Sequence, residues 1–160
     1  MIDDIKKYSK NYNLDYKIVY GLCITESGLN QFAVRYEPGY RYIEDVLSHK
    51  PRGCSTFTER FLQKCSIGVM QVMGGVYRQY GFDGWLSSIF ADIDTQLEYG
   101  CKHLRNKIQK YGLEKGILAY NSGTPIKRNG KYVNQGYFDR VIKHSMEFPK
   151  NYCELFKGVK

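Results

Sequence analysis

The strongest constraint on the fold is an apolar repeat between residues 92 and 111. The repeated residues, spaced three or four apart, are Ile93, Leu97, Cys101, Leu104 and Ile108. This spacing places them on one face of an α-helix. The chain has only 4 prolines and no low-complexity tract. We therefore expect a mainly α (α+β) fold with one long central helix.

Weaker helical periodicity and turn residues mark the remaining segments. Further helices are expected at residues 2–11, 15–27, 41–48, 56–65, 68–80, 114–121, 137–147 and 150–156. Asn13 or Asp15 can supply the N-cap oxygen of the helix at 15–27, and Gly28 allows the chain to turn after it. The dipeptide Asn129-Gly130 predicts a short hairpin across residues 126–134.

Length and composition indicate one domain over residues 1–160. The chain is 42% hydrophobic, which suffices for a core at this size, and no apolar run is long enough to span a bilayer. The first seven residues, MIDDIKK, are polar and charged, so we expect no classical secretory signal and synthesis in the cytoplasm.

The positive charge is concentrated in the last third of the chain. Residues 102–160 contain 13 of the 24 basic side chains and 4 of the 16 acidic ones, and the whole chain carries a net charge of +8. This asymmetry favours a polyanionic partner, such as nucleic acid, an anionic membrane or an anionic cell-wall polymer. The plainer interpretation is that the charge serves solubility.

The cysteine pattern predicts no metal site. The 5 cysteines form no CxxC pair, and the 3 histidines are scattered. Cys23 and Cys101 lie in apolar helical patterns and are expected in the core. A bridge between Cys54 and Cys65 is left open. No metal or organic cofactor is expected.

Three short segments contain polar side chains in apolar surroundings. In the first, Thr25–Gly28, Glu26 ends an apolar-faced helix, where burial raises the pKa of a carboxyl and lets it donate a proton. In the second, Ser66–Met73, Gln71 places an amide in an apolar run, and Gly68 permits close backbone approach. A plainer interpretation makes Glu26 a solvated helix end and bonds Gln71 to a neighbouring loop.

The third segment, Leu118–Gly123, pairs Tyr120 with Asn121 before a glycine turn. A tyrosine hydroxyl and an asparagine amide can both hydrogen-bond a polar ligand. The plainer interpretation is a buried tyrosine followed by a helix cap.

Taken together and in this order, the three segments resemble a known enzyme family. The residues read E-S-G, then G-V-M-Q-V, then A-Y-N-S-G. This pattern is similar to that of the soluble lytic transglycosylases of glycoside hydrolase family 23, which include goose-type lysozyme relatives. Val69 replaces the usual leucine and Ser122 the usual alanine. The resemblance covers about residues 14–123.

The resemblance implies a lysozyme-like, two-lobed fold with a substrate cleft and no cofactor. The substrate it implies is peptidoglycan, cleaved at the β-1,4 bond between MurNAc and GlcNAc with a 1,6-anhydro product. Glu26 matches the catalytic acid, which then acts as a base. Ser27, Met70, Gln71, Tyr120 and Asn121 match positions that line the cleft.

A second carboxylate would favour hydrolysis with water over transglycosylation. Glu37, Glu44, Asp45 and Glu59 all lie between the first two motifs, where goose-type relatives carry acidic residues that position water. Glu37 is the best candidate. The alternative is that Glu37 pairs with Arg35 or Arg41.

The many tyrosines, 15 of 160 residues, suit a sugar cleft because aromatic rings stack on sugar CH faces. We expect Tyr36, Tyr40, Tyr42 and Tyr137 in loops and at the cleft. Tyr20, Tyr99 and Tyr111 are expected in the core.

The expected function is therefore peptidoglycan cleavage by a monomer of the phage-lysin kind, acting at the cell wall after release or delivery. The basic last third would hold it on an anionic cell-wall or outer-membrane surface, and no nucleic acid is expected. A hydrolytic muramidase or chitin-cleaving enzyme is the first alternative. A non-catalytic module that binds glycan or nucleic acid is the second.

Overall fold

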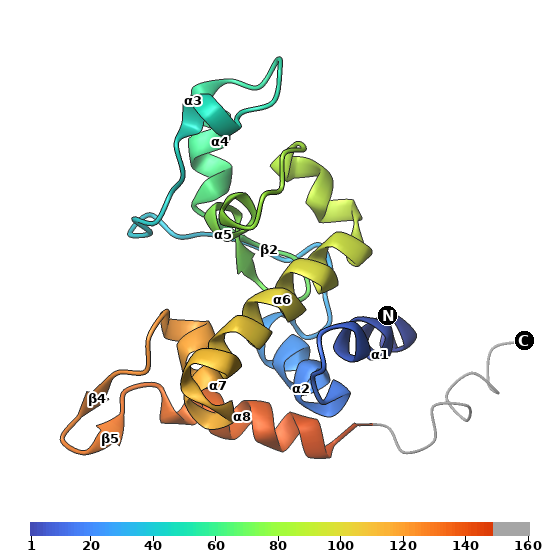
Figure 1. Ribbon diagram of the computed structural model, residues 1–160, viewed down its shortest axis with the longest axis vertical. Coiled ribbons are helices and arrows are strands. Elements are labelled where there is room, and N and C mark those ends of the chain that lie inside the picture. Colours follow the sequence, from blue (N-terminus) through green and yellow to red (C-terminus); the bar gives the residue numbers. More distant parts are fainter. Residues whose placement is uncertain (149–160) are drawn as a thin grey trace, which may run out of the picture.

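The computed structural model describes residues 1–148 and is mainly helical (Figure 1). The helices are α1 (Ile2–Asn11), α2 (Tyr16–Ser27), α3 (Val46–His49), α4 (Thr56–Gln63), α5 (Gly74–Gln79), the 3₁₀ helix η1 (Leu86–Ala91), α6 (Ile93–Tyr111), α7 (Leu113–Ser122) and α8 (Gln135–Met146). The strands are β1 (Val34–Tyr36), β2 (Cys65–Ile67), β3 (Val72–Met73), β4 (Lys127–Arg128) and β5 (Lys131–Tyr132). The expected fold class, mainly α with small β elements, is confirmed.

Helix α6 runs through the middle of the molecule. Figure 1 shows α3, α4 and α5 on one side of it, and α2, α7 and α8 on the other. Strands β1, β2 and β3 form an antiparallel sheet in that order, with Tyr36 opposite Cys65 and Ser66 opposite Met73. The long helix predicted from the apolar repeat is confirmed, since Leu97, Cys101 and Leu104 are fully buried in the core.

Helices α2 and α8 pack closely because Gly21 has no side chain. A Cβ at this position would overlap the Val141 carbonyl oxygen. The predicted caps of α2 are confirmed. Asp15 accepts a hydrogen bond from the Lys17 backbone N–H, and Gly28 takes a left-handed conformation with φ of 63°. The close packing brings the end of α2 beside the first turn of α8.

The helix predicted to begin at Gly68 is wrong over its first six residues. Residues 65–73 form a β-hairpin, and α5 begins at Gly74. The hairpin turn needs positive φ at both Gly68 (78°) and Gln71 (49°). The Gln71 amide compensates this conformation by donating to the carbonyl oxygens of Gly68 and Ala33. Helical spacing of the apolar residues could not show these bonds.

Other observed elements differ from the predicted ones by only a few residues. Helix α3 covers only the end of the predicted 41–48 segment, and α4 ends at Gln63 because the following residues join the sheet. The hairpin predicted at 126–134 is confirmed, with Asn129 and Gly130 at φ of 51° and 77°. The helix predicted at 150–156 lies outside the described residues.

A buried ion pair joins α4 to α5. Arg78 donates to both carboxylate oxygens of Glu59 at 2.8 and 2.9 Å, and both side chains are essentially inaccessible to solvent. Gln63 donates to Glu59 and accepts from the Glu44 backbone N–H. This network fastens residues 44–63 to α5.

The described cysteines are all free thiols. Cys23, Cys54, Cys65 and Cys101 are buried, so the bridge left open between Cys54 and Cys65 is absent, and the core positions predicted for Cys23 and Cys101 are confirmed. Trp85 is the N-cap residue of η1, and its ring lies 3.8 Å from the point where a Cβ at Gly53 would stand. Trp85 is the only tryptophan of the sequence and is 42% exposed.

Candidate active site

A cavity of about 710 Å³ opens between the sheet, α5, α6 and the end of α7. It draws residues from segments far apart in the sequence. The lining residues are Glu26, Arg35, Glu37, Gly39, Tyr40, Tyr42, Ser66, Gln71, Met73, Val76, Gln79, His103, Lys107, Lys110, Tyr111, Tyr120, Asn121, Ser122, Gly123 and Thr124. The three motifs of the sequence therefore meet at one cavity.

Glu26 occupies the last turn of α2 and faces this cavity. The Tyr137 hydroxyl, from α8, donates a hydrogen bond of 2.5 Å to Glu26 Oε1. Burial raises the pKa of the Glu26 carboxyl, while the Tyr137 hydrogen bond and the charges of Arg35 and Arg140 oppose that rise. The net effect is a raised pKa, so Glu26 keeps its proton to higher pH than an ordinary carboxyl. Such a group can act as a general acid.

Arg35 and Glu37 lie on the adjacent edge of the sheet. Arg35 lies in β1 and Glu37 directly follows it; both line the cavity, whereas Tyr36 between them stacks on Phe61. Arg35 Nε donates to Glu37 Oε1 at 2.5 Å. Glu37 thus lines the same cavity as Glu26, and its carboxylate is paired with Arg35, the alternative named for it above.

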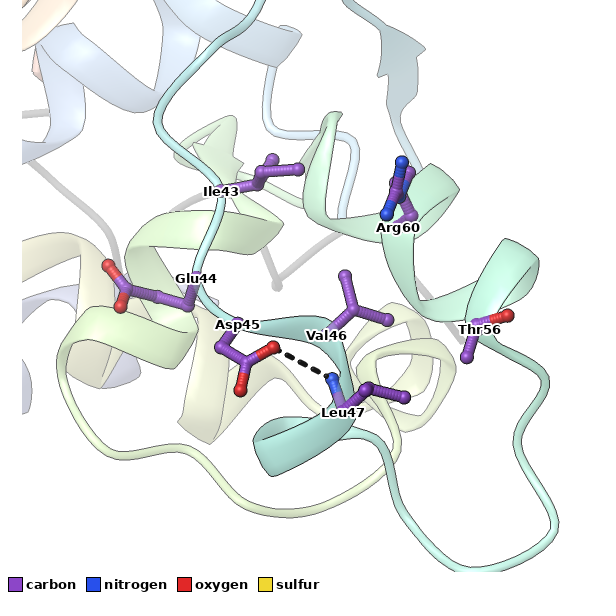
Figure 2. A pocket seen from close by; sticks show the side chains of 7 residues that line it. All are labelled: Ile43, Glu44, Asp45, Val46, Leu47, Thr56 and Arg60. Atoms are coloured by element: carbon purple, nitrogen blue, oxygen red, sulfur yellow. Dashed lines mark hydrogen bonds between the residues drawn. The ribbon is translucent and has the colours of Figure 1, made fainter.

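The other acids between the first two motifs lie elsewhere. Glu59 is buried against Arg78. Glu44 and Asp45 line a separate, smaller cavity of about 480 Å³ beside α3 and α4. Figure 2 shows the Asp45 carboxylate turned to the Leu47 backbone N–H, where it caps α3. These side chains do not join Glu26.

Gln71 lines the cavity, but its amide is already bonded within the protein. It donates to Ala33 and Gly68 carbonyls and accepts from the Ser66 hydroxyl at 2.9 Å. Gly68 permits the close approach predicted for it, because a Cβ there would overlap the Gln96 side chain. Gln96 in turn accepts from the Val69 backbone N–H. The motif thus holds the hairpin rigidly beside Glu26.

Tyr120 and Asn121 lie at the end of α7. The Tyr120 hydroxyl donates to the Met70 carbonyl at 2.8 Å, which ties α7 to the hairpin. Asn121 faces the cavity and accepts from the Asn134 amide at 3.2 Å. Both residues therefore border the space in front of Glu26.

Ser27 and Met70 lie near this site without lining the cavity. The Ser27 hydroxyl donates to the Val69 carbonyl at 2.8 Å, so it links α2 to the hairpin. The Met70 side chain is fully buried and packs against Gly100 of α6. The structure gives both residues contacts that support the site.

The fold and the cavity agree with a comparison against known families. A family model described as the transglycosylase SLT domain matches residues 3–140. The chain belongs to the transglycosylase SLT family. Neither the search of curated proteins nor that of solved structures gave a match.

SLT domains carry lytic transglycosylase-type, peptidoglycan-degrading activity, and the substrate of this chain is accordingly peptidoglycan. Among residues 1–148, no helix is long and apolar enough to cross a membrane. Within the same residues, no group of three or more metal-ligating side chains is assembled.

The tyrosines of this SLT domain site match the sequence expectations only in part. Tyr137 was expected in a loop, yet it is buried on α8 and bonds Glu26. Tyr111 was expected in the core but lines the cavity, whereas Tyr20 and Tyr99 pack on the core as predicted. Tyr40 and Tyr42 line the cavity as expected, whereas Tyr36, also expected there, does not line it and stacks on Phe61.

His103 and Lys107 of α6 line the cavity, although the sequence did not lead us to assign them to the site. The His103 ring shares a hydrogen bond of 2.9 Å with the Tyr80 hydroxyl and lies edge-on to Tyr120. Burial, with the Lys107 charge, lowers the pKa of His103 to about 3, so the ring is neutral at physiological pH. The sequence does contain a signal for them. His103 and Lys107 lie outside the apolar repeat of residues 93–108, which places them on a polar face of the same helix.

Proposed function

We propose that this SLT domain cleaves the β-1,4 bond between MurNAc and GlcNAc with Glu26 as general acid and then general base. The observation that carries the proposal is the position of Glu26. It is a largely buried carboxyl with a raised pKa, held by Tyr137 at the cavity where all three sequence motifs meet. In this proposal Gln71, Tyr120 and Asn121 border the bound glycan, while Ser27 and Met70 hold the hairpin behind it.

The proposed reaction balances without added water. Glu26 gives its proton to the glycosidic oxygen as the bond from that oxygen to the MurNAc anomeric carbon breaks. The 6-hydroxyl oxygen of the same MurNAc then bonds to the anomeric carbon, and the Glu26 carboxylate takes the hydroxyl proton. The products are a strand with a free GlcNAc 4-hydroxyl and a 1,6-anhydroMurNAc end. One carboxyl serves both steps, in contrast to the two that most glycosidases need.

The pairing of Glu37 favours this reaction over hydrolysis. A hydrolase of the inverting kind needs a second carboxylate free to activate water. In this structure the Glu37 carboxylate is bonded to Arg35. Hydrolysis supported by Glu37 is the alternative outcome of the experiment below.

The test is mass spectrometry of the soluble fragments released from purified peptidoglycan. Wild type, Glu26→Gln and Glu37→Gln are compared in parallel. We expect anhydroMurNAc ends from wild type and Glu37→Gln and no fragments from Glu26→Gln, because an amide cannot donate the proton. Reducing MurNAc ends that disappear in Glu37→Gln would make the enzyme a hydrolase. Equal fragments from wild type and Glu26→Gln would overturn the role of Glu26.

The finer biological role is part of the same proposal. We propose a bacteriolytic, monomeric enzyme of the phage-lysin kind whose basic last third contacts an anionic wall or outer-membrane surface. The exposed cations Lys127, Arg128 and Lys131 on the β4–β5 hairpin support the surface contact. Sedimentation with isolated cell walls should weaken as salt rises, since salt screens such contacts. Binding that ignores salt would count against it.

A further inference from the structure

One wall of the cavity carries positive charge that the proposed chemistry does not use. Four lining residues, His103, Lys107, Lys110 and Tyr111, come from the second half of α6. Their spacing of three or four residues places them on one face of the helix. Because His103 is neutral, the charge of this wall comes from Lys107 and Lys110.

Neither lysine has an anionic partner among residues 1–148. Lys107 Nζ donates to the Gly123 carbonyl at 2.7 Å, which leaves its other N–H groups available. Lys110 Nζ lies 5.1 Å from the centre of the Tyr111 ring. No carboxylate of the described part of the chain forms an ion pair with either of them. On the facing sheet edge, by contrast, Arg35 is already neutralised by Glu37.

The two lysines lie three residues apart on α6, so their like charges repel each other to a modest extent. Burial is the main cause that lowers the pKa of Lys107; Tyr111 opposes this shift, and the neighbouring Lys110 charge adds to it. A negatively charged group between the two ammonium groups would remove that repulsion. The α6 side of the cavity, with two lysines that lack a carboxylate partner among the described residues, therefore favours a ligand with an anionic part.

We propose that Lys107 and Lys110 bind the carboxylates of the peptide stems that MurNAc residues carry. This inference rests on the proposed function, because it assumes that the glycan strand occupies the cavity. The GlcNAc units of such a strand carry no charge, so they cannot neutralise two ammonium groups. The stem carboxylates are the anions attached to the strand next to the scissile bond. The lysines thus make the enzyme selective for strands with acidic stems.

The test uses two soluble MurNAc–GlcNAc tetrasaccharides with the same short peptide stems. In one the stems end in carboxylates, and in the other they end in carboxamides. For wild type we expect kcat/KM, counted as total bond cleavage, to be about five- to tenfold higher for the acid form. In Lys107→Gln/Lys110→Gln the acid-to-amide ratio should fall toward one, and in Lys107→Arg/Lys110→Arg it should recover.

The matched control is Lys10→Gln/Lys17→Gln, which removes the same charge from α1 and α2, away from the cavity. Its acid-to-amide ratio should equal that of wild type. A wild-type ratio of one, or a ratio unchanged in Lys107→Gln/Lys110→Gln, would overturn the inference.

The affinities of Glu26→Gln for the two tetrasaccharides separate this inference from the proposed function. Glu26→Gln should bind the acid form more tightly than the amide form, independently of which bond the wild type cleaves. If wild type cleaves neither substrate while Glu26→Gln keeps the preference, only the proposed reaction fails. If cleavage proceeds as proposed and neither ratio departs from one, only the role of the lysines fails.

Discussion

The surroundings of Glu26 shift the pKa of its carboxyl in opposite directions. Burial at the end of α2 favours the neutral acid, while the Tyr137 hydrogen bond and the Arg35 and Arg140 charges favour the carboxylate. A residue that gives and then retakes a proton needs both forms within reach. The side chains around Glu26 therefore set the pH range in which it can work, and each can be removed separately.

We expect Tyr137→Phe to move the upper limb of the pH–activity profile to higher pH. The Tyr137 hydroxyl lowers the pKa of Glu26, so its removal raises that pKa and keeps the acid protonated longer. The pH dependence of kcat/KM on a soluble glycan substrate reports this group in the free enzyme. Arg35→Gln should shift the limb in the same direction, and Tyr132→Phe on the distant hairpin should leave it in place. A limb that moves to lower pH in Tyr137→Phe would contradict the assignment.

We also expect Glu26 to destabilise the folded state at neutral pH. Its pKa in the folded chain is raised above the ordinary value of 4.5, so the folded state holds this proton at pH values where the unfolded state has lost it. Stability from this group is thus full below the unfolded pKa and declines as pH rises through the folded pKa. Glu26→Gln should therefore have a higher Tm than wild type at pH 7 and no advantage at pH 4. The exposed Glu114→Gln should show no gain at pH 7 in the same thermal scans.

At the scale of elements, the sequence was informative wherever structure depends on local spacing. The apolar repeat predicted α6, Asp15 and Gly28 predicted the caps of α2, and Asn129-Gly130 predicted the β4–β5 hairpin. The β2–β3 hairpin was missed because its stability depends on distant partners. Ala33 and Gln96 supply its hydrogen bonds from 38 and 27 residues away.

Gly68→Ala should be strongly destabilising. Gly68 has φ of 78°, and an added Cβ would overlap the Gln96 side chain that holds the hairpin. We expect a loss of about 2–4 kcal/mol in the free energy of unfolding from urea titration. Gly81→Ala is the matched control, because Gly81 has φ of 87° and open space around it. It should lose only about 1–2 kcal/mol. Equal losses in the two variants would mean that Gln96 moves aside freely.

At the scale of the whole molecule, the candidate site combines residues of the three sequence motifs with residues that only the packing of the helices brings close to them. Glu26, Gln71, Tyr120 and Asn121 stood out because each lies in a compact motif. Arg35 and Lys107 reach the same cavity from β1 and α6, and Tyr137 reaches Glu26 from α8. No local pattern records that α2 and α8 touch at Gly21, so the partner of Glu26 became visible only in three dimensions.

The Glu59–Arg78 pair joins the α3–α4 segment to α5. Glu59→Ala leaves the Arg78 charge buried and unpaired, so we expect a loss of about 3–5 kcal/mol in unfolding free energy. The loss should change little between low and high salt, because the pair is shielded from solvent. The control is Asp94→Asn at the exposed Lys7–Asp94 pair, which should cost less than about 1 kcal/mol. A small loss in Glu59→Ala would show that the segment is held by other contacts.

The position of Trp85 gives this chain a built-in optical reporter. The indole is the sole one of the sequence, lies 42% exposed and faces the backbone at Gly53, which precedes α4. We therefore expect its fluorescence to respond when the α3–α4 segment separates from η1. Comparing Trp85 emission with far-ultraviolet circular dichroism during denaturation would reveal whether that segment detaches before the helices unfold.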